Sequence, residues 1–464
     1  MNKVIASVGL AALSAVSVQA QYAPNLTPLE TSKPWSVSAT LRGFYDDNYL
    51  TLPHNYFVGV SASGAPIYTH PLASWGTEII PSASFNHSIE DTLLSASYLY
   101  DLRWNANHSQ TDQTHEFMAR MDHEFSERYK LSVSDSFAIA QEPTVIDPEV
   151  ISSPLYHEGN NVRNTGHIDF TDSLTKSLDL HLGYLNTLYH YQQTEGEVIG
   201  WPFSPGAAFP VQAQPSYSAD LDRIEQLATL DADWKITDET TGILGYQFGH
   251  TDYTSPEYIV YPSGIYATHF YEPPLPPGVG NAGYTANSRN SDSHFVFVGV
   301  NQSFSPELNA SVRAGAEYID YYNFHTSRVS PYVDANLNYQ YLPGDSAQVG
   351  VKHIHNSTDV VGSAGTTPVL DEESTAVYAS DTHKLTERLS ATLMGEAQLS
   401  TFVGGGGGYD GRSEQWFLLE ANFSYRFNPW WVAEAGYNYS KLDSDLPNRA
   451  YTRDFVYLGV RATY

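Results

Sequence analysis

The 464-residue sequence contains no cysteine, which excludes disulfides and thiolate metal sites. After residue 20 it has no continuous apolar run of about 18 residues, the length that a transmembrane helix needs. Basic residues are scarce, because 23 Lys and Arg stand against 52 Asp and Glu, and the formal net charge is -29. This balance argues against a nucleic-acid partner, which requires a basic surface, and against docking on anionic lipid.

The N-terminus has the three parts of a secretory signal peptide. Met1-Asn2-Lys3 is a short basic region, residues 4–18 are apolar, and Val18-Gln19-Ala20 has the pattern of a small-residue cleavage site. We therefore expect a signal peptide over 1–20, cleaved before Gln21. A membrane anchor is the alternative, but the apolar stretch is short for one.

Aromatic residues are plentiful, with 34 Tyr, 20 Phe and 8 Trp, and such side chains suit the pleated surface of strands. The dominant period of the sequence is two. In 35–46, apolar residues such as Val37 and Leu41 alternate with polar ones such as Ser38 and Arg42, and 94–104, 308–318 and 416–426 alternate in the same way. Each run has about ten residues, the length with which a tilted strand crosses a bilayer.

Two kinds of connection separate these runs. Long irregular connections, such as 47–76, 191–222 and 253–290, alternate with short polar turns. The eight short turns lie at 87–93, 125–131, 173–180, 236–242, 305–311, 342–348, 385–391 and 427–433. This alternation predicts an all-β fold, a transmembrane antiparallel β-barrel of about 18 strands (16–18), with short periplasmic turns and long extracellular loops. A soluble β-sandwich is the alternative, but it gives no reason for short and long connections to alternate.

We expect three segments: a signal peptide (1–20), a periplasmic N-terminal leader (21–34) and the transmembrane β-barrel (35–464). The barrel must close, because an open sheet edge cannot lie in lipid with unpaired backbone groups. Aromatic residues at strand ends, such as Trp35, Tyr45 and Trp104, suit the interfacial girdles of such barrels.

Charges of both signs occur in the series of strand residues opposite the apolar one. They would be costly in a packed core unless paired, but cost little in a water-filled lumen, which 18 strands are enough to enclose. The acidic excess predicts a mild preference for cations. The residues predicted to line the pore are Arg42, Asp101, Arg103, Glu116, Arg120, Asp122, Arg313, Glu317, Asp334, Glu420 and Arg426.

The sequence gives no sign of covalent chemistry. GxSxG, HExxH and phosphate-binding glycine motifs are absent. His353-Ile354-His355 and His167-Ile168-Asp169 each place two polar side chains on one strand face, but two ligands do not make a metal site, and polar wall residues are expected. Oxygen-rich clusters such as Asp46-Asp47-Asn48 and Asp371-Glu372-Glu373 could hold divalent cations or be solvated, but they lack calcium-loop spacing, so no specific site is assigned. We expect no enzyme, no catalytic residue, no cofactor and no metal.

The sequence ends in an alternating run, FVYLGVRATY (455–464). Its terminal aromatic residue resembles the insertion signal of bacterial outer-membrane barrels, which implies recognition by the barrel assembly machinery. The first strand, ending in Tyr45-Asp46-Asp47-Asn48, and turns such as LTERLSATL resemble a family named putative outer-membrane β-barrel porins, some of which accompany exopolysaccharide export genes. That family has no catalytic residues to transfer, so the resemblance implies a porin-like protein. The residues assigned to the signal are Val456, Leu458, Val460, Ala462 and Tyr464.

We therefore expect a porin-like outer-membrane channel for passive diffusion of small hydrophilic solutes, either mildly cation-preferring or open to neutral sugars. A structural or surface-interaction barrel, acting in exopolysaccharide export, is the alternative, and an outer-membrane enzyme is the third. Loops 191–222 and 253–290 are candidates for a constriction. Expected partners are the outer-membrane bilayer, the assembly machinery and small solutes or saccharides; the sequence does not indicate an oligomeric state.

Overall fold

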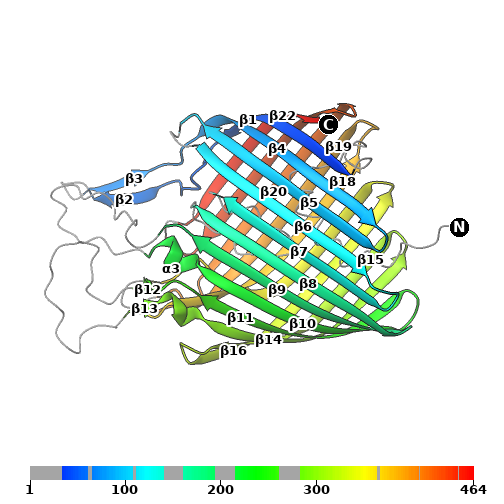
Figure 1. Ribbon diagram of the computed structural model, residues 1–464. Coiled ribbons are helices and arrows are strands. Elements are labelled where there is room, and N and C mark those ends of the chain that lie inside the picture. The colour runs from blue at the N-terminus through cyan, green and yellow to red at the C-terminus, as the bar shows by residue number, and fades with distance from the viewer. Residues whose placement is uncertain are drawn as a thin grey trace.

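The computed structural model describes residues 34–60, 65–107, 111–140, 160–193, 215–260, 283–362, 366–406, 408–447 and 449–464. The expected signal peptide and the expected leader up to residue 33 lie outside the described residues. Eighteen strands form one closed antiparallel sheet (Figure 1). The strands of its first half are β1 (Trp35–Asp46), β4 (Ser74–Ile89), β5 (Thr92–Asn105), β6 (Thr111–Glu124), β7 (Tyr129–Ala140), β8 (Asn161–Thr175), β9 (Leu178–Tyr191), β10 (Arg223–Lys235) and β11 (Thr240–Tyr253).

The second half of the barrel follows the same up-and-down order. Its strands are β14 (Ser291–Ser305), β15 (Leu308–Tyr321), β16 (Thr326–Leu342), β17 (Asp345–Asn356), β18 (Val369–Lys384), β19 (Leu389–Gly404), β20 (Ser413–Asn428), β21 (Trp431–Ser444) and β22 (Tyr451–Thr463). The predicted count of eighteen strands is confirmed. All eight predicted short turns are confirmed as well, because each of them joins two consecutive barrel strands.

The barrel is closed by its first and last strands. β1 pairs with β4 on one side and with β22 on the other, in a register that runs from Ser38↔Thr463 to Asp46↔Phe455. Beyond the strand, Tyr464 exchanges two backbone hydrogen bonds with Val37. Closure leaves no free edge at this junction, as a sheet in lipid requires.

The two ends of the barrel differ (Figure 1). The short turns gather at one end, and the small elements outside the barrel sheet lie at the other end. They are β2 (Tyr56–Val60), β3 (Pro66–Thr69), α3 (Tyr217–Leu221), β12 (Tyr258–Val260), β13 (Tyr284–Thr285) and η2 (Ala286–Arg289). Three connections at that end depart from the prediction of long loops, because the strands of the pairs β5–β6, β15–β16 and β21–β22 are separated only by residues 106–110, 322–325 and 445–450. No helix in the described part of the chain is long and apolar enough to cross a bilayer.

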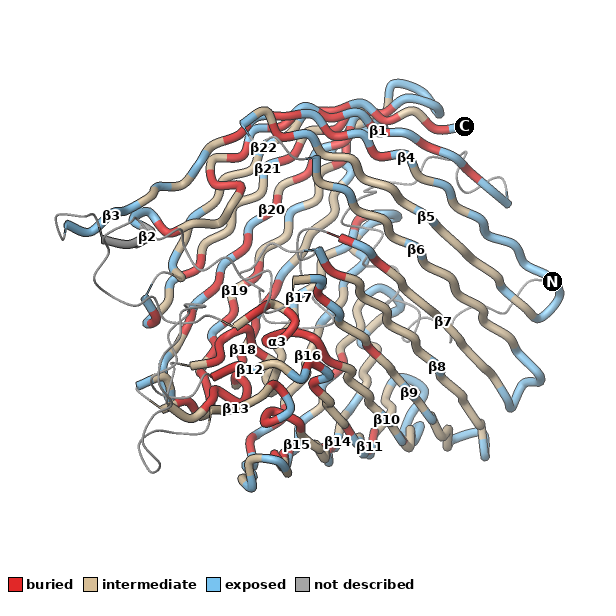
Figure 2. Tube along the Cα trace, turned by 60° about the vertical axis from the view of Figure 1, so that its left-hand side comes forward, coloured by how far each residue is buried: buried red, intermediate tan, exposed pale blue. Residues whose placement is uncertain are grey.

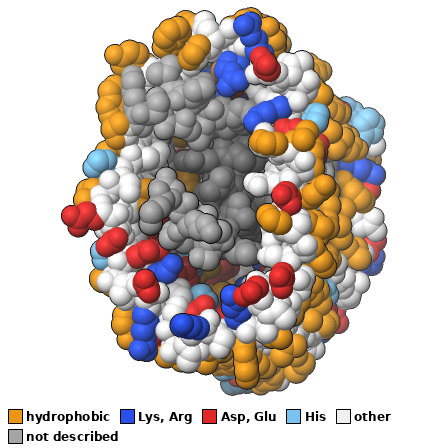
Figure 3. All heavy atoms as spheres, turned by 90° about the vertical axis from the view of Figure 1, so that its right-hand side faces the viewer, with side chains coloured by type: hydrophobic (Ala, Val, Ile, Leu, Met, Phe, Trp, Pro, Cys, Tyr) orange, Lys and Arg blue, Asp and Glu red, His pale blue; other side chains and the backbone are white. Residues whose placement is uncertain are grey.

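The side chains of each strand divide between two faces, as the period of two predicts. In β1, Val37 and Leu41 are 48% and 59% exposed, whereas Ser36 and Arg42 are 5% and 7% exposed. The exposed residues form a hydrophobic outer wall, while charged side chains gather around the mouth at the short-turn end (Figure 3). We call the two faces the outward series and the lumen series. Aromatic contacts, such as that between Trp75 and Trp104 with ring centroids 6.2 Å apart, lie on the outward series near the strand ends.

One ladder of the barrel wall is incomplete. β16 pairs with β15 up to Tyr321↔Thr326, but it pairs with β17 only up to Val333↔His353. β17 continues beside β18 as far as Asn356↔Glu372. The segments Thr326–Tyr332 and Ile354–Asn356, all of them described residues, therefore have no ladder between them.

Candidate functional site

The candidate site is the lumen wall. Its part nearest the short turns is rich in hydroxyl groups. Between β1 and β4, Ser36 and Ser38 contact Ser84 and Ser82 through Oγ–Oγ hydrogen bonds of 2.7 Å each. Between β19 and β20, Ser390 and Ser424 form a similar bond of 3.0 Å. Such rows arise because a hydroxyl at every second position of neighbouring strands meets its counterpart across the ladder.

A network of ion pairs spans the junction where the barrel closes. Arg42 of β1 donates to Glu78 of β4 (3.3 Å) and to Glu434 of β21 (2.9 Å). Arg103 of β5 also binds Glu78, at 3.0 Å, and Arg461 of β22 lies 3.3 Å from Glu434. We call these five residues the closing network. Each carboxylate lies between two guanidinium groups, so burial of the charges is compensated by pairing.

Aromatic rings of the lumen series contact the closing network. The guanidinium carbon of Arg42 lies 4.4 Å from the centroid of the Tyr457 ring. That of Arg103 lies 5.6 Å from the Phe44 ring and 5.5 Å from the Phe455 ring. These distances are within the range of cation–π attraction, so the rings add to the pairing of the arginines.

Acidic side chains dominate another part of the wall, on β8, β9 and β10. Asp169 lies 3.0 Å from His167, and Asp233 lies 3.6 Å from His181. Asp231 neighbours Asp233 on the same face of β10 and is 8% exposed. Because histidine is charged only when protonated, this part of the wall carries more negative than positive charge near neutral pH.

Two apolar clusters also face the lumen. Trp416, Leu418 and Leu442 form one, with Met394 and Tyr451 packed against it. The second comprises buried residues of β11, β14 and β16, with Leu227 and Ile354 packed against them: Ile243, Phe295, Phe297 and Tyr332. We call this second set, including Leu227 and Ile354, the seam cluster.

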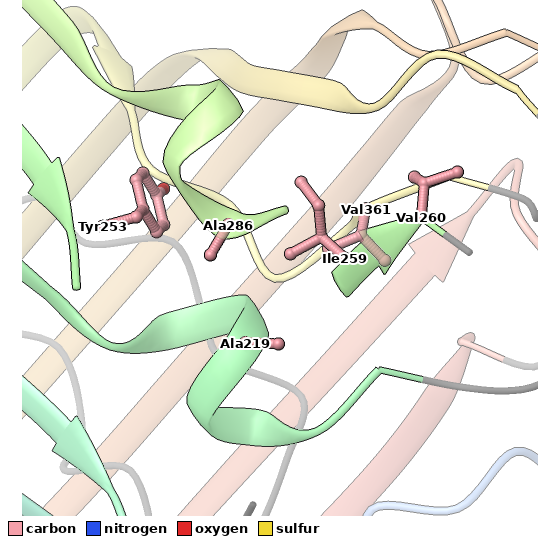
Figure 4. Packing of buried hydrophobic residues seen from close by; sticks show 6 residues of the cluster. All are labelled: Ala219, Tyr253, Ile259, Val260, Ala286 and Val361. Atoms are coloured by element: carbon pink, nitrogen blue, oxygen red, sulfur yellow. The ribbon is translucent and has the colours of Figure 1, made fainter. Parts of the chain in front are cut away.

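The end opposite the short turns carries a small core of its own (Figure 4). Ala219 of α3, Ile259 and Val260 of β12, Ala286 of η2 and Val361 pack together with Tyr253. Figure 2 shows the same region, around α3, β12 and β18, as the largest concentration of buried residues. We call the described residues 215–222, 254–260, 283–290 and 357–361 the loop cap.

Two arginines link the segments of the loop cap to one another and to barrel strands. Arg289, 1% exposed, donates to the carbonyl of Thr358 at 2.9 Å and to the carbonyl of Asp220, and its guanidinium carbon lies 4.2 Å from the Tyr253 ring. Arg449 pairs with Asp359 at 2.9 Å and with Glu414. Burial raises the pKa of Asp220 well above its ordinary value.

The cap contains residues 215–222, 254–260 and 283–290 of the two loops predicted to constrict the barrel, 191–222 and 253–290. The described residues pack against one another at this end. The remainder of both loops, 194–214 and 261–282, lies outside the described residues, and a constriction stays a prediction.

The predicted pore-lining residues all lie on the lumen series, and the structure brings several of them together. Arg120 binds Asp122 at 2.8 Å, and Arg313 stands opposite Asp334 in the β15–β16 ladder. Arg42, Arg103 and Asp101 surround Glu78. Glu116, Glu317 and Glu420 lie elsewhere on the same face, and Arg426 lies at the short-turn end, where it donates to the Glu387 carbonyl at 2.8 Å. Their role in lining a solute path stays a prediction.

Sequence reasoning missed Glu78 as a lumen residue. Its signal was present, because Glu78 alternates with Thr77 and Ile79 in the run that precedes the first short turn. The two histidines of β17 are a second departure from expectation. His353 lies on the outward series, where it contacts Thr375 (2.7 Å) and Glu373 (3.0 Å), and the buried His355 binds Asp371 (2.9 Å).

Among the described residues no group of three or more His, Asp or Glu side chains is placed to hold a metal ion. The oxygen-rich stretch at Asp46 is engaged in protein contacts, because Asp46 binds Arg453 and accepts from the Asn48 backbone N–H at 3.1 Å.

The C-terminal part of the chain matches a known family. Residues 280–464 match the model of the family described as "Putative beta-barrel porin 2". No curated protein sequence matches the chain.

Solved structures of outer-membrane proteins have a similar chain trace at low sequence identity. OccK2 (OpdF) of Pseudomonas aeruginosa, in complex with glucuronate, is 10% identical, with a TM-score of 0.39 over 92% of this chain and 98% of that one. OpdK of Pseudomonas aeruginosa with vanillate is 10% identical, with a TM-score of 0.42 over 93% and 99%. OccAB4 of Acinetobacter baumannii is 10% identical, with a TM-score of 0.41 over 93% and 99%. These values are too low for the likeness to bear on function.

The family match covers the strands from β14 to β22, which make up half of the barrel wall. The whole wall is one closed sheet with a hydrophobic outward series and a polar lumen series. Residues 280–464 therefore carry the sequence pattern of the porin family, and the chain as a whole forms a porin-like β-barrel of the bacterial outer membrane.

Proposed function

We propose that the barrel passes small hydrophilic solutes by passive diffusion, with a mild preference for cations and access for neutral sugars. The observation that carries the proposal is the separation of the two faces. Charged and hydroxyl side chains are concentrated on the lumen series, whereas the outward series is mainly apolar. A polar wall of this kind suits water and polar solutes.

The preference for cations rests on the acidic wall of β8, β9 and β10. Asp169, Asp231 and Asp233 lie there with histidine as the nearest positive neighbour on these strands. Rings and rows of carboxylates favour cations in channels. The hydroxyl rows near the short turns offer hydrogen bonds without charge, which suits neutral sugars as well.

Planar-bilayer recording of the purified protein tests this proposal. We expect stable open conductance. In a salt gradient, the reversal potential should have the sign that preferential passage of cations produces. Asp233→Asn should shift that potential toward zero, because it removes a lumen charge. Asp135→Asn is the matched control, since Asp135 lies on the outward series opposite Ala119 and Gly166. A protein that inserts but stays silent contradicts the channel, and equal effects of both variants contradict the assignment of selectivity.

A surface-interaction barrel in exopolysaccharide export is the second candidate, and one observation favours it. The β2–β3 hairpin projects away from the barrel at the loop end (Figure 1), and Ile67 and Tyr68 of β3 are 44% and 51% exposed. Aromatic and apolar side chains of this kind can stack on sugar rings. Double substitution of Ile67 and Tyr68 by Ser should then abolish polysaccharide binding by the purified barrel and leave its conductance intact.

Assembly through the C-terminal series is part of the same proposal. Val456, Leu458 and Val460 are 45%, 68% and 41% exposed on the outward series of β22, and Tyr464 is 67% exposed. Their side chains project from the barrel surface, where the assembly machinery has access to them.

A further inference from the structure

The incomplete ladder between β16 and β17 lies where an apolar outward series on β15 and β16 meets polar residues of β17 and β18, His353 and Glu373. Beyond the last pair, Val333↔His353, β16 continues toward the loop end with Pro331 and Val329 exposed on the outward series. Val329 is 70% exposed. On its other side β16 remains paired with β15, where Tyr318, 41% exposed, stands opposite Val329. The pairing to β17 therefore ends before the hydrophobic series of β16 does. We call this place the seam.

Backbone groups in lipid need partners, and the seam meets this need without a ladder. Pro331 has no N–H to offer a neighbouring strand, which suits an edge. The N–H of His355 donates instead to the carboxylate of Glu317 on β15, at 3.3 Å. The His355 ring binds Asp371 at 2.9 Å, and the Tyr321 hydroxyl donates to the same carboxylate. Side chains thus replace the ladder at this point.

An apolar cluster lies directly behind the seam on the lumen side. Tyr332 and Ile354 are the first residues beyond the last ladder pair on β16 and β17, and both belong to the seam cluster. The Tyr332 ring packs on Phe295 and Phe297, with centroid distances of 5.6 Å and 5.5 Å. A polar lumen has no need of such a surface for hydrophilic solutes. The seam is filled by these side chains in the structure, so passage requires them to move.

Two donors and one acceptor near the seam cluster have no hydrogen-bond partner among the described residues. The donors are the Nε of Arg313 and the Oγ of Ser330, which is 8% exposed, and the acceptor is the Oδ1 of Asp231, which lies with the Phe297 ring beside Gly245. The guanidinium carbon of Arg313 lies 5.8 Å from the Phe297 ring centroid. Apolar rings with two spare hydrogen-bond donors at their border suit a molecule with an aromatic body and a polar, uncharged acceptor group.

We propose that the seam between β16 and β17 is a lateral exit, through which an uncharged aromatic amphiphile leaves the lumen for the outer leaflet after binding at the seam cluster. This proposal rests on the channel function proposed above and adds a second class of solute and a second direction of passage. Hydrophilic solutes follow the barrel axis, whereas the amphiphile turns sideways where the wall lacks backbone bonds.

A reversible lock across the seam tests the exit. Because the chain has no cysteine, Tyr332→Cys combined with Ile354→Cys introduces the only two thiols, at positions that face each other if the ladder register is extended by one pair. Neighbouring antiparallel residues have the Cα separation that a disulfide requires. Ala335→Cys with Val351→Cys is the control, since it links the same strands where they are already paired.

The readout is uptake of N-phenyl-1-naphthylamine, an uncharged aromatic dye, into the outer membrane of Gram-negative cells producing each variant. We expect loss of uptake when the seam pair is oxidised, recovery on reduction, and no effect of the control lock. Uptake that persists through a seam lock verified by gel mobility overturns the proposal.

A second variant keeps the proposal testable if the seam pair does not crosslink. Tyr332→Ala removes the ring that fills the seam, so dye uptake should increase. Tyr457→Ala, which truncates another lumen tyrosine at the closing network, should not raise it. Equal uptake in Tyr332→Ala and the unaltered protein overturns the lateral exit. Ion conductance is measured on the same proteins. If the barrel conducts ions but the dye test fails, only the lateral exit is refuted. If the barrel does not conduct ions, the channel function is refuted.

Discussion

The closing network makes a prediction about stability that can be worked out from its contacts. Arg42 connects β1 to β4 through Glu78 and to β21 through Glu434, across the junction of the first and last strands. Replacement by Met keeps an unbranched stem of similar shape but removes the guanidinium group and with it both ion pairs. Glu78 then retains Arg103, at 3.0 Å, and Glu434 retains Arg461, at 3.3 Å, so neither carboxylate is left alone.

The expected loss follows from these remaining partners. Removing one partner of a buried ion pair costs about 3–5 kcal/mol, and the surviving arginines place Arg42→Met near the lower end of that range. Loss of the contact with the Tyr457 ring, 4.4 Å from the guanidinium, adds about 0.5–1 kcal/mol. We therefore expect the free energy of unfolding to fall by about 3–4 kcal/mol.

Equilibrium unfolding in lipid vesicles, followed by tryptophan fluorescence, measures this loss. In a double-mutant cycle with Glu434→Gln, the two substitutions should couple by about 1–3 kcal/mol, because a neutral amide at this position does not require the positive charge of Arg42. Arg128→Ala is the control: Arg128 pairs with Asp172 at a solvated turn, and its loss should leave stability nearly unchanged. A loss for Arg42→Met no larger than that for the control would refute the reasoning.

Three further predictions address the wall, the loop cap and assembly. A Cβ at Gly315 would overlap the Val296 carbonyl oxygen, so Gly315→Ala should lower the yield of folded barrel, measured by its gel mobility before and after heating. The raised pKa of Asp220 means that the folded cap favours the protonated carboxyl. The contribution of this carboxyl to stability is therefore fully present below the ordinary Asp pKa of about 3.9 and is lost as pH rises through the raised pKa. Proteolysis of the cap should therefore accelerate with pH in the unaltered protein but less in Asp220→Asn; equal pH dependence would contradict this. Tyr464→Ala should reduce the amount of barrel in the outer membrane, measured by cell fractionation, and unchanged amounts would contradict a signal in this residue.

Much of the barrel could be predicted because its rules are local. A period of two assigns every residue to a face once one member is assigned, so Leu41 outward implies Arg42 inward. Turn chemistry then placed the eight hairpins, and each hairpin set the register of its own two strands. The face of Glu78 was available from the same rule, through its neighbours Thr77 and Ile79.

What the sequence did not show depends on pairs that no turn connects. Arg42 and Glu434 meet across β22, although they lie near opposite ends of the sequence, and no local pattern relates them. Trp416 faces Leu442 within the β20–β21 hairpin, but Met394 of β19 and Tyr451 of β22 pack against this pair from strands that the turn at 427–433 does not connect. The sequence contained one local indication of the seam, Pro331 within an alternating run. A proline there indicates an unpaired strand edge only if the ladder with β17 ends beside it, and the sequence does not show where that ladder ends.

The antiparallel ladder between β1 and β22 has a consequence for how such a chain can change in length. Deleting a single strand would leave an odd number, and the first and last strands would then run parallel and could not form the observed ladder. Deleting or duplicating a whole hairpin preserves the direction of both and alters only the circumference. As long as the antiparallel closing ladder is kept, strands are therefore gained or lost as pairs with their short turn, and the width of the barrel changes in steps of two strands.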